Sequence, residues 1–256
     1  MSILETIAAA TRLRVQREKA EPLIRNAVRH PVPFLFERRL RHPGMSFICE
    51  IKKASPSRGV IAEEFPYLQI ARQYEEAGAA ALSVLTEPDY FLGHNRYLAE
   101  IRGRTELPIL RKDFIVDPFQ IEQSAALGAD AVLLICALLT PQELAAYIKR
   151  ADALGLSCLV EAHDEEEVKT ALDAGARAVG VNNRDLKTFE VDTGNSLRLR
   201  KLVPSNILFV AESGIRTAQD VRLLKAHGVN AVLVGETLMR AADKSAALDA
   251  LRGETA

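Results

Sequence analysis

The most constraining feature of the chain is a unit that recurs eight times: an apolar run ending in polar residues, followed in most cases by a helical pattern. The runs occupy residues 46–52, 80–87, 107–113, 130–136, 156–162, 177–183, 206–213 and 230–236. They consist largely of valine, isoleucine, leucine and alanine, with little alternation of polar and apolar residues. This is typical of parallel strands that are buried on both faces.

Helical patterns separate these runs at 68–79, 118–129, 141–155, 164–176 and 217–228. A glycine stands where each should end, at Gly78, Gly128, Gly155, Gly175 and Gly228. Eight strand–helix units match a (β/α)8 TIM barrel, which is typically about 250 residues long. The alternative, an open doubly wound sheet, usually has a glycine-rich turn after its first strand, and the sequence has none there. We predict one TIM-barrel domain over 1–256, with an N-terminal helical extension at 1–45 and the barrel at 46–256.

The N-terminal segment predicts a helix and not a signal peptide, because charged residues interrupt its apolar stretch. Ser2 and Glu5 have the spacing of a capping box. The apolar residues that follow form a helical stripe, made of Leu4, Ile7, Ala8 and Leu13. No apolar stretch reaches the roughly 18 to 20 residues that a membrane span needs. We expect a soluble, cytoplasmic protein without a membrane partner.

The charge, cysteine and histidine content make nucleic acid and metal ions unexpected as ligands. A net charge of −1 gives no reason to expect binding to nucleic acid, so attraction for an anion must be local. Cys49, Cys136 and Cys158 lie in apolar runs and are expected to be reduced, buried thiols. The histidines are scattered, without metal-ligand spacing. We predict no metal and no cofactor, and we expect a monomer or a weak homodimer.

The first apolar run carries charges at its end. Ile48, Glu50 and Lys52 share one face of a strand, and the opposite face is more apolar. Glu50 and Lys52 should therefore point into the barrel mouth, with Lys53 outside it. Other strand ends carry Glu87, Lys112, Asp113, Glu161, Asn182, Asn183, Arg184, Glu212 and Ser213. A closed barrel would gather these residues in one cleft, where lysines and glutamates shift one another's pKa and are suited to acid–base catalysis.

The loops after the last two strands predict a phosphate site. Gly214 follows the seventh strand and Gly235 the eighth, and both precede a helical pattern. Glycine allows a close approach of the backbone, and free amides at a helix start bind phosphate. The loops after strands seven and eight are the usual phosphate site of such barrels. Since a carboxylate repels phosphate, we expect the Glu236 side chain to turn outward while its amide faces the ligand.

Seven segments together have the order and spacing of one enzyme family: EIKKASPSRG, SVLTEPDYFLG, ILRKDFIVDPFQI, LVEAH, GVNNRDL, VAESGI and VLVGETLM. On these segments the chain resembles the indole-3-glycerol phosphate synthases, lyases of tryptophan biosynthesis. The resemblance covers essentially the whole chain, including the N-terminal extension. One departure is His94, where the family more often has serine; we expect a tolerated loop substitution.

The resemblance implies a phosphosugar substrate, 1-(2-carboxyphenylamino)-1-deoxyribulose 5-phosphate, which closes to an indole with loss of carbon dioxide and water. It implies that Lys112 is the general acid and Glu161 the later base, while Glu50 and Lys52 orient one another and the substrate. How the two lysines divide the protonation steps stays open. The rest of the implied site comprises Asn182, Arg184, Glu212 and Ser213 as polar groups, Gly214, Gly235 and Glu236 at the phosphate, Ser55 in the first loop, and Phe91, Phe114, Leu133 and Leu186 around the aromatic ring.

Two other functions remain as alternatives. A sugar-phosphate isomerase of the phosphoribosylanthranilate isomerase type is expected to use a cysteine–aspartate pair, for which Cys136 lies nearest to a strand end. A non-catalytic barrel that binds a phosphorylated ligand would have to explain why lysines and glutamates stand together at the strand ends. Both alternatives are less consistent with the residues than the lyase.

Overall fold

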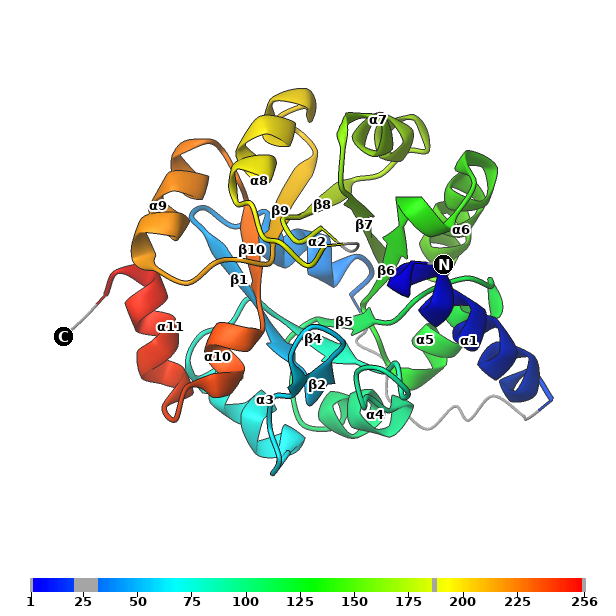
Figure 1. The fold of residues 1–256 in the computed structure, drawn as a ribbon, viewed down its shortest axis with the longest axis horizontal. Helices are drawn as coiled ribbons and strands as arrows, with labels where there is room; N and C mark the ends of the chain where they lie inside the picture. The colour runs from blue at the N-terminus through cyan, green and yellow to red at the C-terminus, as the bar shows by residue number, and fades with distance from the viewer. Residues whose placement is uncertain (1, 21–31, 186–187, 255–256) are drawn as a thin grey trace.

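The computed structural model describes residues 2–20, 32–185 and 188–254. Within these residues, eight parallel strands close a barrel in the order β1-β10-β9-β8-β7-β6-β5-β4 (Figure 1). The strands are β1 Ser46–Ile51, β4 Ala81–Leu85, β5 Ile109–Lys112, β6 Ala131–Ile135, β7 Ser157–Ala162, β8 Ala178–Asn182, β9 Leu208–Glu212 and β10 Ala231–Val234. Each lies inside one of the eight predicted runs, so the predicted TIM barrel is confirmed.

Helices surround the strands (Figure 1). They are α3 Tyr67–Glu76, α4 Asn95–Arg102, α5 Phe119–Leu127, α6 Pro141–Ala153, α7 Glu165–Asp173, α8 Gly194–Leu199, α9 Ala218–Ala226, α10 Glu236–Arg240 and α11 Lys244–Arg252, with short 3-10 turns at Cys136–Leu138 and Arg200–Leu202. All five glycines predicted to end helices have positive φ, the left-handed conformation that terminates a helix. None of the helices in the described ranges is both long and apolar enough to cross a membrane.

Alternation along the strands divides the buried side chains into two cores. Ile48 of β1 packs in the barrel interior, as do Leu159 of β7 and Val210 of β9. Phe47 and Cys49, on the other face of β1, pack against the surrounding helices. Glu161 and Glu212 lie two residues after Leu159 and Val210, so both continue the interior-facing rows to the carboxyl ends of their strands. The predicted orientation of the first strand is confirmed.

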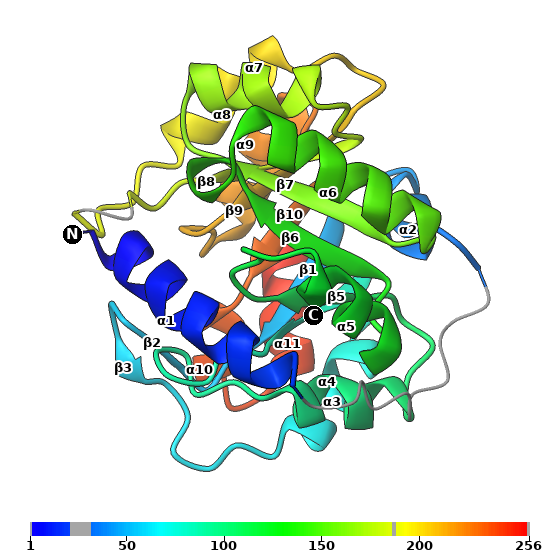
Figure 2. The ribbon, with the colours of Figure 1, turned by 90° about the vertical axis from the view of Figure 1, so that its right-hand side faces the viewer.

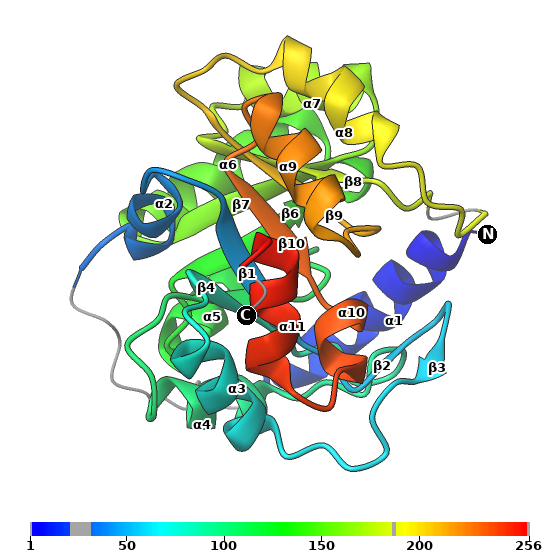
Figure 3. The ribbon, with the colours of Figure 1, turned by 90° about the vertical axis from the view of Figure 1, so that its left-hand side faces the viewer.

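The N-terminal extension contributes one helix to each end of the barrel. Figures 2 and 3 place α1 (Ile3–Glu18) at the same end as a small hairpin of β2 (Ala54–Ser55) and β3 (Gly59–Val60), with α2 (Leu35–Leu40) at the opposite end. Phe36 and Leu40 of α2 join the interior core. The carboxylate of Glu37 accepts from Arg177, just before β8, at 2.9 Å. The helix α2 thus closes the amino-terminal end of the barrel and leaves the carboxyl end for ligands.

The helix α1 follows the predicted capping box and buries Ile7 and Ala8 of the predicted stripe, whereas Leu13 lies on the opposite side of the helix. Ser2 and Glu5 exchange the two capping hydrogen bonds, and Ile7 is buried. The prediction that Leu13 packs inward is wrong, because its side chain is 69% exposed. Arg14 occupies the buried face instead, where its guanidinium lies 2.8 Å from Asp113 beyond β5. This ion pair sets the rotation of α1.

Candidate active site

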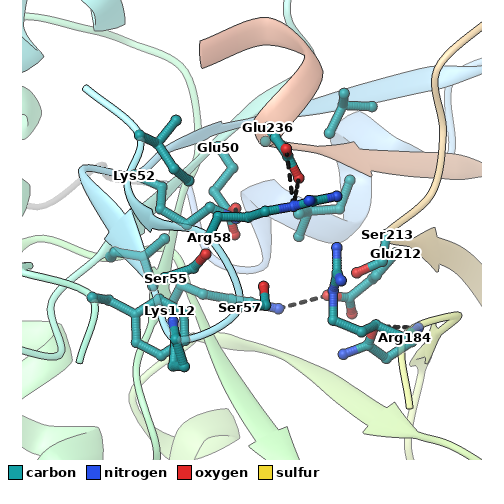
Figure 4. Close-up of a pocket in the computed structure, with 18 of the residues that line it drawn as sticks. Glu50, Lys52, Ser55, Ser57, Arg58, Lys112, Arg184, Glu212, Ser213 and Glu236 are labelled. Carbon is teal, nitrogen blue, oxygen red and sulfur yellow. Dashed lines mark hydrogen bonds and ion pairs between the residues drawn. The ribbon is translucent and has the colours of Figure 1, made fainter. Parts of the chain in front are cut away.

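The carboxyl ends of the strands surround a cavity of about 560 Å³. Its wall contains every site residue that the family resemblance implied except Leu186, which lies outside the described residues. Glu87 and Asn183, which the strand-end pattern also placed in the cleft, do not line the cavity. The strand ends contribute Glu50, Lys52, Lys112, Leu133, Glu161, Asn182 and Glu212. Loops and the start of α10 contribute Ser55, Phe91, Phe114, Arg184, Ser213, Gly214, Gly235 and Glu236. Figure 4 shows several of these side chains converging from different strands.

Lys112 lies between two carboxylates. Its Nζ is 2.5 Å from Glu212 on β9 and 3.4 Å from Glu161 on β7. Burial lowers the pKa of Lys112, but the charges of Glu212 and Glu161 outweigh it and raise that pKa above its ordinary value. Lys112 is therefore an ammonium group that points into a shielded cavity. Such a group can give a proton to a developing alkoxide and stabilise its charge.

The two glutamates around Lys112 differ in their proton affinity. Burial raises the pKa of Glu212, and its pairing with Lys112 offsets only part of this effect. Burial also raises the pKa of Glu161, but Lys112 and His163 lower it below the ordinary value. The Glu161 contacts to Lys112 and Asn182 are both 3.4 Å long. Glu161 is thus the ionised and more loosely held carboxylate, as a proton acceptor requires.

Glycine makes room for each ion pair. A Cβ on Gly180 of β8 would collide with the carboxylate of Glu212. A Cβ on Gly235 would collide with the carboxylate of Glu50 and lie 3.0 Å from Lys52 Nζ. Lys52 donates to Glu50 in a close ion pair, so these two residues orient one another as predicted. The two glycines explain how a narrow barrel mouth holds several charged side chains.

Two other predicted strand-end acids have structural roles. Asp113 is buried and binds Arg111 at 3.0 Å, Arg14 at 2.8 Å and the Thr86 hydroxyl at 2.7 Å. Glu87 accepts from the backbone amides of Asp89, Tyr90 and Phe91 at 2.8 to 3.0 Å. These bonds fix the loops that follow β5 and β4.

The apolar wall of the cavity contains two aromatic rings. Phe91 and Phe114 lie with their ring centroids 5.9 Å apart and tilted by 42°. They come from the loops that Glu87 and Asp113 hold in place. Leu133 on β6 adds an aliphatic surface to the same cavity. An aromatic part of a ligand would find its apolar contacts here.

The backbone of the turn after β9 has a left-handed conformation that lets a ligand approach it closely. Ser213 has φ 66° and Gly214 φ 83°, and Asn183 donates to the Ser213 carbonyl at 3.0 Å. A Cβ on Gly214 would lie 2.5 Å from Val191. Asn183, which the strand-end pattern placed with the site, therefore supports this turn from behind.

The prediction that the Glu236 carboxylate turns outward is wrong. It accepts from Arg58 and Arg240, each at 3.2 Å, and Figure 4 shows it facing Arg58 across the cavity mouth. Arg58 extends from the β2–β3 hairpin, and its charge together with that of Arg240 lowers the pKa of Glu236, against the opposing effect of burial. The guanidinium groups provide the counter-charge that the sequence argument left out.

Known proteins are similar to this chain over nearly its whole length. A family model described as indole-3-glycerol phosphate synthase matches residues 4–251. The indole-3-glycerol phosphate synthase of Ruminiclostridium cellulolyticum is 58% identical over 257 residues, which cover 98% of this chain and 99% of that protein. That of Endomicrobium trichonymphae is 54% identical, covering 93% and 95%. The chain belongs to the indole-3-glycerol phosphate synthase family.

Solved structures outside the family share only the fold. The 3-hexulose-6-phosphate synthase of Salmonella typhimurium aligns with a TM-score of 0.66 at 16% identity, covering 82% of this chain and all of that one. At such identity the likeness supports the barrel and not an activity. The family assignment therefore rests on the sequence relatives.

Within the indole-3-glycerol phosphate synthase family, His94 is the one departure that the sequence showed. Its Nδ1 accepts from the backbone amide of Arg96 at 2.9 Å, so the imidazole caps the N-terminus of α4. A serine hydroxyl can do the same. His94 thus caps α4 and does not line the cavity that holds Lys112.

Sequence reasoning missed two groups at the site, Arg58 and His163. Arg58 lies in the cavity wall, and His163 Nε2 lies 3.4 Å from Glu161. The sequence did carry a signal for each, a cation in the loop after the first strand and a histidine two residues after a predicted base. The Arg58 signal could not be used without its partner Glu236, which is 178 residues away. The partners of His163, Glu161 and Glu167, lie close to it in the sequence, so the sequence could have pointed to this histidine.

Proposed function

We propose that this chain is an indole-3-glycerol phosphate synthase, a carboxy-lyase that acts in tryptophan biosynthesis. One observation carries the proposal beyond family membership: a buried ammonium, Lys112, lies beside an ionised carboxylate, Glu161, in a cavity with an aromatic wall. This pairs a proton donor with a proton acceptor in the same shielded space. The substrate is 1-(2-carboxyphenylamino)-1-deoxyribulose 5-phosphate.

The first step is ring closure. The ring carbon that bears the carboxylate attacks the ribulose carbonyl carbon, and Lys112 gives its proton to the carbonyl oxygen. The attacking ring carbon becomes sp³, so the adjacent iminium accepts the electron pair when the carboxylate leaves as carbon dioxide. This step restores the aromatic ring. Lys52, paired with Glu50, lies where it can bind the substrate carboxylate before its loss.

The second step is dehydration. Glu161 removes a proton from the methylene carbon next to nitrogen, while the hydroxyl group formed in the first step takes a proton from the Lys52 ammonium group, which lines the same cavity, and leaves as water. The long contacts of Glu161, at 3.4 Å to both Lys112 and Asn182, leave its oxygens open to the substrate. Asn182 and Ser213 bind hydroxyl groups of the sugar chain in this proposal.

The phosphate end of the substrate binds at the opposite side of the mouth. Gly214 and Gly235 give the backbone access, while Arg58 and Arg184 line the same cavity. The Arg58–Glu236 ion pair crosses this region, so Arg58 has a carboxylate partner that phosphate would replace. Figure 4 shows Arg58 and Arg184 extending into the mouth from different loops.

The isomerase alternative is less well supported. Cys136 would have to act as the acid or base, but burial raises the pKa of its thiol to about 12. Its Sγ lies 3.6 Å from the carbonyl of Glu167, and it does not line the cavity that holds Lys112. A thiol in this position has no access to a ligand in the barrel mouth.

We also propose a cytoplasmic location and a monomer or weak homodimer, with residues 1–256 as one domain. The apolar core continuous around the barrel and the packing of α1 and α2 onto it support a single domain. The free cysteines Cys49, Cys136 and Cys158 are in keeping with a reducing compartment. Sedimentation of the purified chain at several concentrations would measure the assembly. A stable tetramer would contradict it.

The activity test uses the purified chain and the carboxyphenylamino substrate alone. Indole fluorescence should rise with time, and carbon dioxide should be released in equal amount. The phosphoribosylanthranilate precursor, tested in parallel, should give no product. Turnover of that precursor in place of the carboxyphenylamino substrate would favour the isomerase, and binding of either without turnover would favour the non-catalytic barrel.

A further inference from the structure

His163 follows β7 directly and lies between two acids. Its Nε2 is 3.4 Å from Glu161. On the other side, the Glu167 carboxylate on α7 lies 3.0 Å from Nδ1 and also accepts from the His163 backbone amide at 2.8 Å. The His163 carbonyl in turn accepts from Asn195 at 3.1 Å. The ring is therefore held through Glu167, and its buried Nε2 lies near Glu161 without a hydrogen bond to it among the described residues.

The two acids constrain the protonation of the ring. An ionised carboxylate only accepts hydrogen bonds, so Glu167 places a proton on Nδ1. A neutral ring would then present the lone pair of Nε2 to Glu161, which is repulsive. Only the imidazolium gives both carboxylates a positively charged N–H. Burial lowers the pKa of His163, but the hydrogen bond to Glu167 and the charges of Glu161, Glu167 and Glu212 raise it to about 9.

The imidazolium gives Glu161 a lasting positive neighbour, which the long contacts to Lys112 and Asn182 do not. Lys112 forms its closer ion pair with Glu212, at 2.5 Å. It also loses its positive charge when it protonates the substrate. His163 lies outside the wall of the cavity that holds Lys112, so its charge persists through that step. We propose that His163 is a positioning residue that orients Glu161 and keeps it ionised as the base of the dehydration step.

The surroundings of His163 favour the charged ring. It lines a second cavity of about 880 Å³, which shares Asn182 and Arg184 with the first. Inside the barrel mouth the nearby charges are Glu161, Lys112 and Glu212. Around the second cavity, besides Glu167, they are the acids Asp164, Asp185, Glu190 and Asp192 and the bases Arg184 and Arg198. The acids outnumber the bases, so this side does not oppose a positive imidazole.

The kinetic test rests on the proposed function and compares His163→Asn with the wild type. The acidic limb of the kcat/KM profile reports ionisation of the base in the free enzyme. Loss of a cation about 3.4 Å away should raise the pKa of Glu161, so this limb should move to higher pH by about one unit or more. His227→Asn, an exposed histidine at the end of α9, is the matched control and should leave the profile in place.

A merely structural role would lower kcat/KM by the same factor at every pH, with the acidic limb unmoved, and that result would overturn the proposal. Above the shifted limb the variant should regain most of its activity. If the wild type itself shows no turnover, the proposed function fails and this arm says nothing against His163.

The second arm needs no activity. An NMR titration of the histidine ring protons should show His163 titrating well above the ordinary value near 6.5. In Glu161→Gln and in Glu167→Gln its midpoint should move to lower pH, because each change removes one carboxylate partner. A His163 midpoint near 6.5 in the wild type, or one that neither substitution moves, would overturn the proposal.

Discussion

Lys52 and Lys112 differ in the number of carboxylates that they contact. Lys52 pairs with one acid, Glu50, whereas Lys112 contacts two acids from different strands. The second arrangement gives Lys112 a fixed position in the middle of the cavity. This fixed position is consistent with our proposal that Lys112 is the donor in ring closure.

Lys112→Ala should therefore lower kcat by at least about 10²-fold, the lower range for loss of a general acid. KM should change less, since the phosphate and aromatic contacts remain. Steady-state kinetics measure both constants. The variant also leaves Glu161 and Glu212 without their shared cation, so circular dichroism must show an intact fold. An effect confined to KM would mean that Lys112 only binds substrate.

At Gly180, the addition of a single carbon atom should disturb the site. Gly180→Ala places a methyl group against the Glu212 carboxylate, which must move away from Lys112. We expect a loss of about 1–3 kcal/mol in unfolding free energy, the usual cost of overpacking a core, and a fall in kcat. Gly103→Ala is the matched control, since its Cβ would meet only the Glu100 carbonyl at an ordinary 3.6 Å. Equal behaviour of the two variants in urea denaturation would contradict this account.

At the scale of elements, α1 is coupled to the loop that follows β5. Arg14 reaches Asp113 at 2.8 Å, and Asp113 also binds Arg111 of β5, next to Lys112. Lys19 contacts Asp117 at 2.6 Å further along the same loop. Ile3, Leu4 and Ile7 of α1 also line the cavity. The helix thus forms part of the mouth and fixes the position of the loop after the proposed acid.

Arg14→Gln should loosen α1 and raise KM, because the wall of the mouth that α1 provides would no longer be fixed. Asp113 keeps Arg111 as its partner, so we expect a modest loss of about 1–3 kcal/mol in unfolding free energy. Arg17→Gln on the same helix is the control, since among the described residues the exposed Arg17 side chain contacts only the carbonyl of Leu13. A KM that rises equally in both variants would remove Arg14 from this role.

The helices and strands also show which features of the site could be predicted from the sequence. Period-two alternation along 46–52 placed Glu50 and Lys52 in the mouth, because a one-residue error would put charges against the helices. The same logic applied to Glu161 and Glu212. It could not give Glu236 its full environment, since one of its partners, Arg58, reaches it from a distant loop. Contacts of this kind are set by the packing of distant segments and leave no local pattern.

At the scale of the whole molecule, the two ends of the barrel have different roles. All of the described site residues that the family resemblance implied line the cavity at the carboxyl end. The amino end is closed by α2, whose Phe36 is fully buried among interior side chains of the barrel. In TIM barrels the carboxyl face carries catalysis and the opposite face stability. Here the N-terminal extension serves both, with α1 at the site and α2 at the closed end.

Phe36→Ala tests this separation. Removing a buried phenyl group should cost about 3–5 kcal/mol of unfolding free energy, measured by urea denaturation. The kcat and KM of the remaining folded protein should stay close to those of the wild type at low temperature, because the cavity lies at the other end. Leu202→Ala, at a side chain that is 45% exposed, is the control and should change neither quantity appreciably. A large fall in kcat for Phe36→Ala with the fold intact would show that the two ends are coupled through the barrel interior, and the division of roles would then be wrong.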